Sequence, residues 1–168
     1  MVRTSLILIC FLCSNIHSRL SPEDEQCVRC ICEASTACFS ILECAKKGIS
    51  VDYWRQAGAL VVTGGVVNDQ SDDAYAECIQ DESCVLETID SYTKKILRHI
   101  NDVNCDGIVD CRDYFSAHKF GTGAKNPDSV FKPAQTKRFD RCEGHGVGNL
   151  TDSGWKPGIC FTIRNNFS

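Results

Sequence analysis

Oxygen-bearing residues follow one another at the spacing of a calcium-binding loop between residues 102 and 113. The candidate ligands are the side chains of Asp102, Asn104, Asp106, Asp110 and Asp113 and the backbone carbonyl of Ile108. Gly107 stands where such a loop makes its sharp turn. Carboxylates this close together repel one another unless a cation neutralises them. The spacing therefore predicts a structural Ca²⁺ that fixes two helices, although Asp113 has a shorter arm than the usual Glu. The alternative is an acidic loop in which Asp110 caps the following helix.

The cysteines are the second group that could do chemistry. Five of them lie within the 18 residues from Cys27 to Cys44. In a small secreted domain such cysteines form disulfides, and a zinc site is the weaker alternative. We expect disulfides from Cys27, Cys30, Cys32, Cys38, Cys44, Cys78, Cys84, Cys105, Cys111 and Cys142. Removal of Cys10 and Cys13 with a leader peptide leaves 11 of the 13 cysteines, so one thiol lacks a partner, and Cys160 is the easiest candidate.

The ends of the chain differ in character from its middle. Residues 1–18 have the charge and apolar pattern of a signal peptide, so we expect a soluble, extracellular protein. A lead-in over 19–26, one domain over 27–146 and an irregular tail over 147–168 complete the predicted organisation. No later apolar run is long enough to span a membrane. The mature chain carries 17 Lys and Arg against 22 Asp and Glu, a balance poorly matched to nucleic acid or another polyanion.

Helices must hold these groups in place. The sequence predicts helices over 23–42, over 73–100 with a break near 81–83, and over 113–120, which Gly121 ends. Two β-branched runs on either side of Gly64-Gly65 predict a β-hairpin over 59–67. The hairpin either packs inward or exposes an edge to a partner, and packing is favoured. The expected fold is a small, mostly α, disulfide-rich domain with one short hairpin.

The cysteine ladder resembles the start of invertebrate-type lysozymes, also called the destabilase family. The similar segments are Cys27-Val-Arg-Cys30-Ile-Cys32-x5-Cys38-x5-Cys44, Tyr53-Trp54, Cys78-x5-Cys84, Cys111-x-Asp113-Tyr114-x3-His118 and Cys142-Glu-Gly-His145-Gly. The resemblance covers about residues 27–146. It implies a lysozyme-like α+β fold and hydrolysis of bacterial peptidoglycan in antibacterial defence or digestion. Some members are also credited with isopeptidase activity.

The resemblance also marks the positions of two catalytic carboxylates, and neither carboxylate is present. The family acid is a Glu three residues after the third ladder cysteine, where this chain has Ser35. The second carboxylate is an Asp three residues after the fifth, where this chain has Lys47. The Cys-Gly strand that follows in active members is missing as well, which gives a second explanation for the odd cysteine count. We therefore expect weak or no hydrolysis, with binding of peptidoglycan retained.

Other residues offer alternative chemistry. Glu33, Glu43 and Asp52 are weak candidates for a shifted pair of carboxylates, which would need to lie roughly 5–9.5 Å apart. Glu33 is two residues from Ser35, so on a helix it points about 200° away. Ser35 and His118 are candidates for a nucleophile and its base in isopeptide hydrolysis, without an assignable third group. The remaining alternative is a calcium-stabilised binding protein without catalysis.

Overall fold

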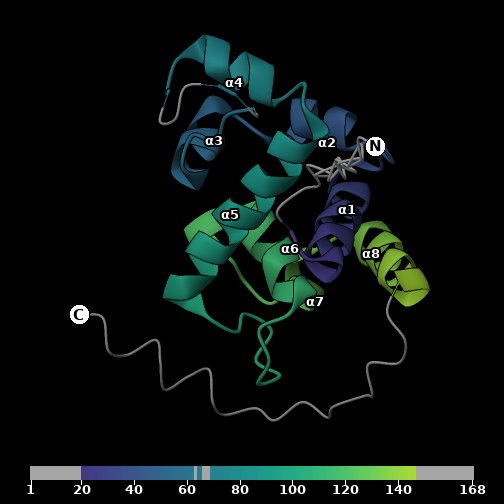
Figure 1. The fold of residues 1–168 in the computed structure, drawn as a ribbon. Helices are drawn as coiled ribbons and strands as arrows, with labels where there is room; N and C mark the ends of the chain where they lie inside the picture. The colour runs from purple at the N-terminus through teal and green to yellow at the C-terminus, as the bar shows by residue number, and fades with distance from the viewer. Residues whose placement is uncertain (1–19, 63, 66–68, 147–168) are drawn as a thin grey trace, which may run out of the picture.

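The structure, a computed structural model, describes residues 20–62, 64–65 and 69–146, and it is helical throughout that part (Figure 1). The elements are α1 (Pro22–Thr36), α2 (Ile41–Gly48), α3 (Val51–Ala57), α4 (Asp72–Cys78), α5 (Glu82–Ile100), α6 (Cys111–Phe120), the short 3-10 helix η1 (Gly121–Gly123), α7 (Pro127–Val130) and α8 (Pro133–Gly146). The predicted signal peptide, the tail over 147–168 and Cys160 lie outside the described residues. No helix within those limits is long and apolar enough to cross a membrane.

Helix α1 begins where the sequence predicts but ends earlier. Ser21 caps its N-terminus by accepting a hydrogen bond from the Asp24 N–H at 3.1 Å. The helix stops at Thr36, whose hydroxyl donates to the Cys32 carbonyl and accepts from the Cys38 N–H. Ala37 then takes a left-handed conformation with φ 58°. The single helix predicted over 23–42 is therefore wrong, because the Thr36 side chain binds the backbone groups that would continue it.

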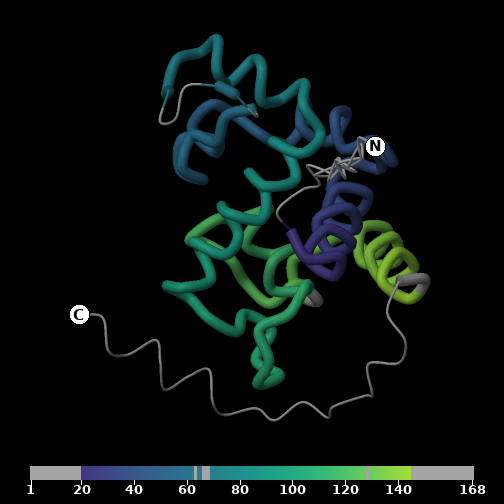
Figure 2. Tube along the Cα trace, viewed as in Figure 1, coloured from purple at the N-terminus to yellow at the C-terminus, as the bar shows by residue number. Residues whose placement is uncertain are grey.

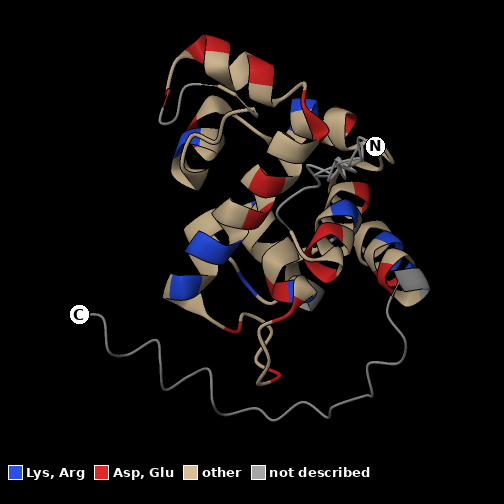
Figure 3. Ribbon diagram, in the orientation of Figure 1, with Lys and Arg blue, Asp and Glu red and all other residues tan. Residues whose placement is uncertain are grey.

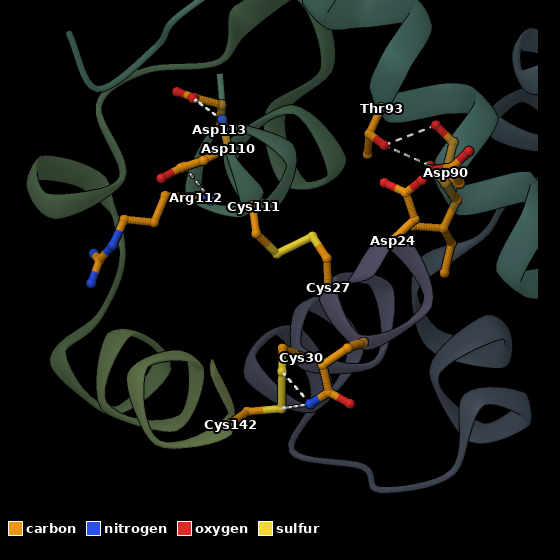
Figure 4. Close-up of a disulfide and its surroundings, with 12 residues drawn as sticks. Asp24, Cys27, Cys30, Asp90, Thr93, Asp110, Cys111, Arg112, Asp113 and Cys142 are labelled. Atoms are coloured by element: carbon orange, nitrogen blue, oxygen red, sulfur yellow. Dashed lines mark hydrogen bonds between the residues drawn. A yellow bond between two sulfur atoms is a disulfide. The ribbon is translucent and has the colours of Figure 1, made fainter. Parts of the chain in front are cut away.

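Three disulfides join α1 to three other helices. The bridges are Cys27–Cys111 to the start of α6, Cys30–Cys142 to α8 and Cys32–Cys44 to α2. Figure 4 shows the first two bridges leaving α1 from Cys27 and Cys30 toward Cys111 and Cys142. Because these cysteines lie on the buried side of α1, the bridges hold its apolar face against its neighbours.

The long central helix α5 is preceded by a break, as the sequence predicts. Asp81 caps α5 by accepting from the Cys84 N–H at 2.7 Å, and the Cys78–Cys84 disulfide joins α4 to α5 across the break. Figure 2 shows α5 running through the middle of the molecule between α3 and α4 on one side and α6 on the other. Acidic residues gather on α4 and basic residues at the C-terminal end of α5 (Figure 3).

Two apolar clusters fill the interior. The larger one surrounds Trp54, whose side chain is fully buried and whose indole N–H donates to the Leu60 carbonyl at 2.7 Å. The smaller one lies between α1, α6 and α8, where Phe115 stacks on Phe131 and Phe139 with ring centroids 3.9 and 4.8 Å apart. Aromatic contacts of this kind add to the stabilisation from burial.

The hairpin predicted over 59–67 is not found in the part of it that the structure describes. Residues 60–62 form no strand, and the Gly65 N–H closes a turn onto the Val62 carbonyl at 2.8 Å. The Leu60, Val61 and Val62 side chains pack against the larger apolar cluster instead. Residues 63 and 66–68 lie outside the described residues. Packing of the apolar run onto the helices therefore accounts for its composition without strand pairing.

Removal of the Cys30–Cys142 bridge is expected to cost more stability than removal of Cys78–Cys84. While the Cys27–Cys111 bridge is intact, the shortest covalent path from Cys30 to Cys142 runs through it, so the second bridge closes a loop of roughly 34 residues. In the chain-entropy model this loop adds about 4 kcal/mol to the free energy of unfolding. Cys78 and Cys84 are 6 residues apart, and the same model gives about 2 kcal/mol. Urea unfolding of the Cys30→Ala/Cys142→Ala and Cys78→Ala/Cys84→Ala variants measures both. Equal losses would contradict the prediction.

Candidate functional site

A polar pocket of about 370 Å³ opens where the C-terminal ends of α1, α2 and α6 meet. Its lining residues are Ser35, Thr36, Lys47, Gly48, His118 and Lys119. The structure thus brings together both positions of the family's carboxylates and the predicted histidine. Thr36, Gly48 and Lys119, which the sequence analysis did not single out, are each the next residue in the chain after a predicted one.

The Cys32–Cys44 disulfide lies directly behind the pocket. Ser35 is three residues after Cys32 on α1, and Lys47 is three residues after Cys44 on α2. Three residues on a helix bring a side chain back to nearly the same face. The Ser35 side chain therefore lies on nearly the same face of α1 as Cys32, and the Lys47 side chain on nearly the same face of α2 as Cys44.

The hydroxyl of Ser35 is buried without a hydrogen-bond partner. Among the described residues, Ser35 Oγ stands alone in this respect as a buried side-chain oxygen or nitrogen. An unpaired buried polar atom costs about 1–3 kcal/mol, which a ligand at the pocket would offset by pairing with it. A serine hydroxyl is far too weak an acid to protonate a glycosidic oxygen, so its position alone does not restore the acid of an active lysozyme.

Lys47 contacts a thiol, and it is itself a cation at the position where an anion that could stabilise a positively charged sugar was expected. Its Nζ lies 3.1 Å from Cys38 Sγ. Cys38 is the free cysteine of the described residues, so the expectation that it pairs in a disulfide is wrong. The hydrogen bond from Lys47 lowers the pKa of the Cys38 thiol, and the thiol in turn raises the pKa of Lys47. The two side chains form a partly exposed pair in which the Lys47 ammonium group favours the thiolate form of Cys38.

His118 is buried at the back of the pocket. Its Nδ1 lies 2.9 Å from the Tyr53 hydroxyl, and a side chain added at Gly48 would first meet its Nε2. Tyr53 itself stacks on Tyr92 with ring centroids 3.7 Å apart. Burial lowers the pKa of His118 to about 4, so the imidazole is neutral at pH 7 and a weak base there.

The three alternative carboxylates do not line the pocket. Glu33 forms an ion pair with Arg141 of α8 at 2.8 Å, on the side of α1 that packs against α8. Glu43 pairs with Lys46 at 2.9 Å. Asp52 is exposed in the first turn of α3. No Asp or Glu within the described part of the chain lines the pocket, so the pair of carboxylates that glycoside hydrolysis needs is missing from it.

The two carboxyl groups whose pKa values are raised most strongly lie elsewhere. Burial raises the pKa of Asp113 to about 6, despite three backbone N–H groups that bind its carboxylate. Burial, with the nearby charge of Asp110, raises the pKa of Glu143 to about 7. Glu143 was missed in the sequence, where nothing distinguishes it from a surface glutamate. Neither group lines the pocket, so neither supplies it with an acid.

The predicted calcium ligands bind backbone N–H groups of their own loop. Asp102 accepts from Cys105 and Gly107, and Asp106 accepts from Ile108. Asp110 and Asp113 form a reciprocal capping box at the start of α6.

In the described part of the chain, no group of three or more His, Cys, Asp or Glu side chains is arranged to hold a metal ion. The side-chain amide of Asn104 donates a hydrogen bond to the Asp106 carboxylate at 2.9 Å, so these two side chains bind each other instead of a common metal position. The alternative reading of an acidic loop that caps a helix therefore describes the observed contacts.

Comparison with known proteins identifies the family. The family model described as Destabilase matches residues 24–142, which is most of the chain, and the protein belongs to this family of invertebrate-type lysozymes. Neither the curated proteins nor the solved structures gave a match. The family resemblance of the cysteine ladder is thus confirmed.

Loss of Lys47 is expected to slow alkylation of Cys38 several-fold at pH 7. The thiolate is the reacting species, and Lys47 stabilises it through the 3.1 Å contact. Peptide-resolved mass spectrometry after timed iodoacetamide treatment measures the rate in the Lys47→Met variant. Lys46→Met is the matched control, because Lys46 lies on the same helix but pairs with Glu43. A rate that falls equally in both variants would show that general charge, not this contact, activates Cys38.

Proposed function

We propose that this destabilase-family protein is secreted and binds bacterial peptidoglycan without efficient hydrolysis. The observation that carries the proposal is the composition of the pocket, which is lined by Ser35 and Lys47 and by no carboxylate among the described residues. The family resemblance leads us to expect carboxylates at these two positions. Hydrolysis with either stereochemical outcome needs a protonated and an ionised carboxyl group on opposite sides of the bond. A hydroxyl and an ammonium group supply neither function.

Retained binding rests on the framework and the size of the pocket. The Cys32–Cys44 bridge and the packing of α1 on α2 do not depend on the pocket side chains. The pocket is also polar and open enough for a saccharide, and its size falls within the range of roughly 300–1,000 Å³ that small ligands occupy. A family member that loses its acid can therefore keep a surface that recognises the glycan.

Hydrolysis of isopeptides is the second candidate function, because Ser35 and His118 line the same pocket. Two features weaken it. The low pKa of His118 makes it a poor base at neutral pH, and the group at its Nδ1 is the Tyr53 hydroxyl rather than a carboxylate. We expect no cleavage of an ε-(γ-glutamyl)lysine substrate above that of the Ser35→Ala variant.

The first experiment compares lysis and binding on the same cell walls. Wild-type protein is expected to sediment with insoluble Gram-positive peptidoglycan but not to clear the suspension. The Ser35→Glu/Lys47→Asp variant is expected to gain measurable lysis, because it restores a carboxyl group at each position. The single variants Ser35→Glu and Lys47→Asp are the controls and should gain little. Clear lysis by the wild type would overturn the proposal, as would failure of the wild type to bind the walls.

Structural calcium remains a prediction from the spacing of residues 102–113. Asp102, Asp106 and Asp110 accept hydrogen bonds from backbone N–H groups near their own positions, and their remaining lone pairs would coordinate the ion. If the ion binds, millimolar Ca²⁺ will raise the melting temperature relative to EDTA, and Asp106→Ala will abolish the increase. Equal melting temperatures of the wild type in Ca²⁺ and EDTA would refute the prediction and leave the loop as a helix cap.

A further inference from the structure

We infer that the pocket is an oxyanion site that takes the carboxylate or phosphate ester group of an acidic sugar. The inference rests on the proposed glycan binding and deepens it, since it names the part of the saccharide that the pocket selects. It predicts a preference for acidic over neutral sugars, the reverse of what a cleft built around two carboxylates would favour.

The charge of the lining points to an anionic ligand. Lys47 and Lys119 are both exposed at the pocket, from the ends of α2 and α6. Lys119 makes no ion pair within the described part of the chain. No carboxylate is among the described lining residues, so the two lysines give the pocket a positive charge that a negative group would neutralise.

Two lining residues of the same pocket carry uncharged donors. Ser35 Oγ is buried and unpartnered, so a small opening of the pocket would make its hydrogen available to a bound oxygen. His118 Nδ1 is occupied by the Tyr53 hydroxyl. When that hydroxyl donates, His118 Nε2 carries the ring hydrogen and faces the pocket beside Gly48. A hydroxyl, an imidazole N–H and two ammonium groups together form a set of donors that could bind an oxyanion.

The negative net charge of the whole chain limits how many negative charges the ligand can carry. The formal net charge is −4, and Glu43 lies near enough to act on Lys47. A long polyanion would be repelled by this surface. One anionic group on an otherwise neutral sugar fits the pocket and avoids that repulsion.

Cys38 is expected to weaken anion binding at the pocket through its contact with Lys47. Its thiol is a partner of Lys47 at 3.1 Å, so a bound anion competes with it for the same ammonium group. Replacement of the thiol with a hydroxyl removes an ionisable competitor. Cys38→Ser is therefore expected to strengthen anion binding, whereas loss of Lys47 weakens it.

Calorimetric titration with four defined probes tests the inference. The probes are N-acetylmuramic acid, N-acetylglucosamine 6-phosphate, neutral N-acetylglucosamine and inorganic phosphate. At least one acidic sugar is expected to bind about tenfold more tightly than neutral N-acetylglucosamine. Comparison of the two acidic sugars with each other shows whether the pocket prefers a carboxylate or a phosphate ester. Equal affinity for acidic and neutral sugars would overturn the inference. Inorganic phosphate that binds as tightly as its sugar ester would overturn the assignment to a saccharide.

Variants locate the binding within the pocket. Lys47→Met and Lys119→Met are each expected to weaken the acidic sugar several-fold, and Lys46→Met should not change it. Unchanged thermal unfolding of each variant excludes loss of fold. If the double Lys47→Met/Lys119→Met variant keeps the full affinity for the acidic sugar, the site is wrong.

Sedimentation with peptidoglycan separates this inference from the proposed function. Walls that bind the wild type and the double variant equally would leave the proposed function intact and refute the role of the lysines. Walls that bind neither protein would refute the proposed function itself. Weaker binding of the double variant alone supports both.

Discussion

The covalent attachment of α1 to α2, α6 and α8 is the constraint on which the rest of the structure depends. A chain of this size has limited apolar area with which to order the helices of its described part, several of which have two turns or fewer. Isolated helices of that length are marginal in water. Three disulfides from one helix replace part of the missing packing energy, because they reduce the freedom of the unfolded chain. The phenylalanine stack and the cluster around Trp54 then fill the space on either side of α1 and α5.

The pocket shows how far the chemistry of a site can change on a fixed frame. At the two positions where the family resemblance leads us to expect carboxylates, this chain has a neutral hydroxyl, Ser35, and a cation, Lys47. Asp113 and Glu143, the carboxyl groups with the most strongly raised pKa values, lie in other parts of the molecule, where burial is the largest cause and Asp110 adds to it. A raised carboxyl pKa therefore does not mark the pocket, and the geometry of the pocket decides which groups can act on a ligand.

Much of this could be predicted from the sequence, for physical reasons that differ between elements. The break before α5 and the start of α6 follow from Asp81 and Asp110, which are strong caps. The end of α1 was missed because Thr36 and Ala37 act through side-chain bonds and a left-handed turn, which leave no periodic signal. The hairpin was overpredicted because β-branched residues fit a helical core as well as a strand. Ser35, Lys47 and His118 were found through the family pattern, but only the fold shows that they line one pocket. The fold also shows that Cys38 contacts Lys47 and forms no disulfide with another cysteine.

The placement of the Cys32–Cys44 bridge has a consequence for how such proteins diverge. Ser35 and Lys47 each stand one helical turn beyond a bridged cysteine, so the separation of their backbones is set by a covalent bond and not by attraction between their side chains. Replacement of either residue then carries little cost in folding free energy. Selection can exchange acid, hydroxyl and amine at these two positions while the backbone stays in place. The bridge thereby uncouples the stability of the domain from the identity of its chemistry, and a lineage can abandon one reaction without first losing its fold.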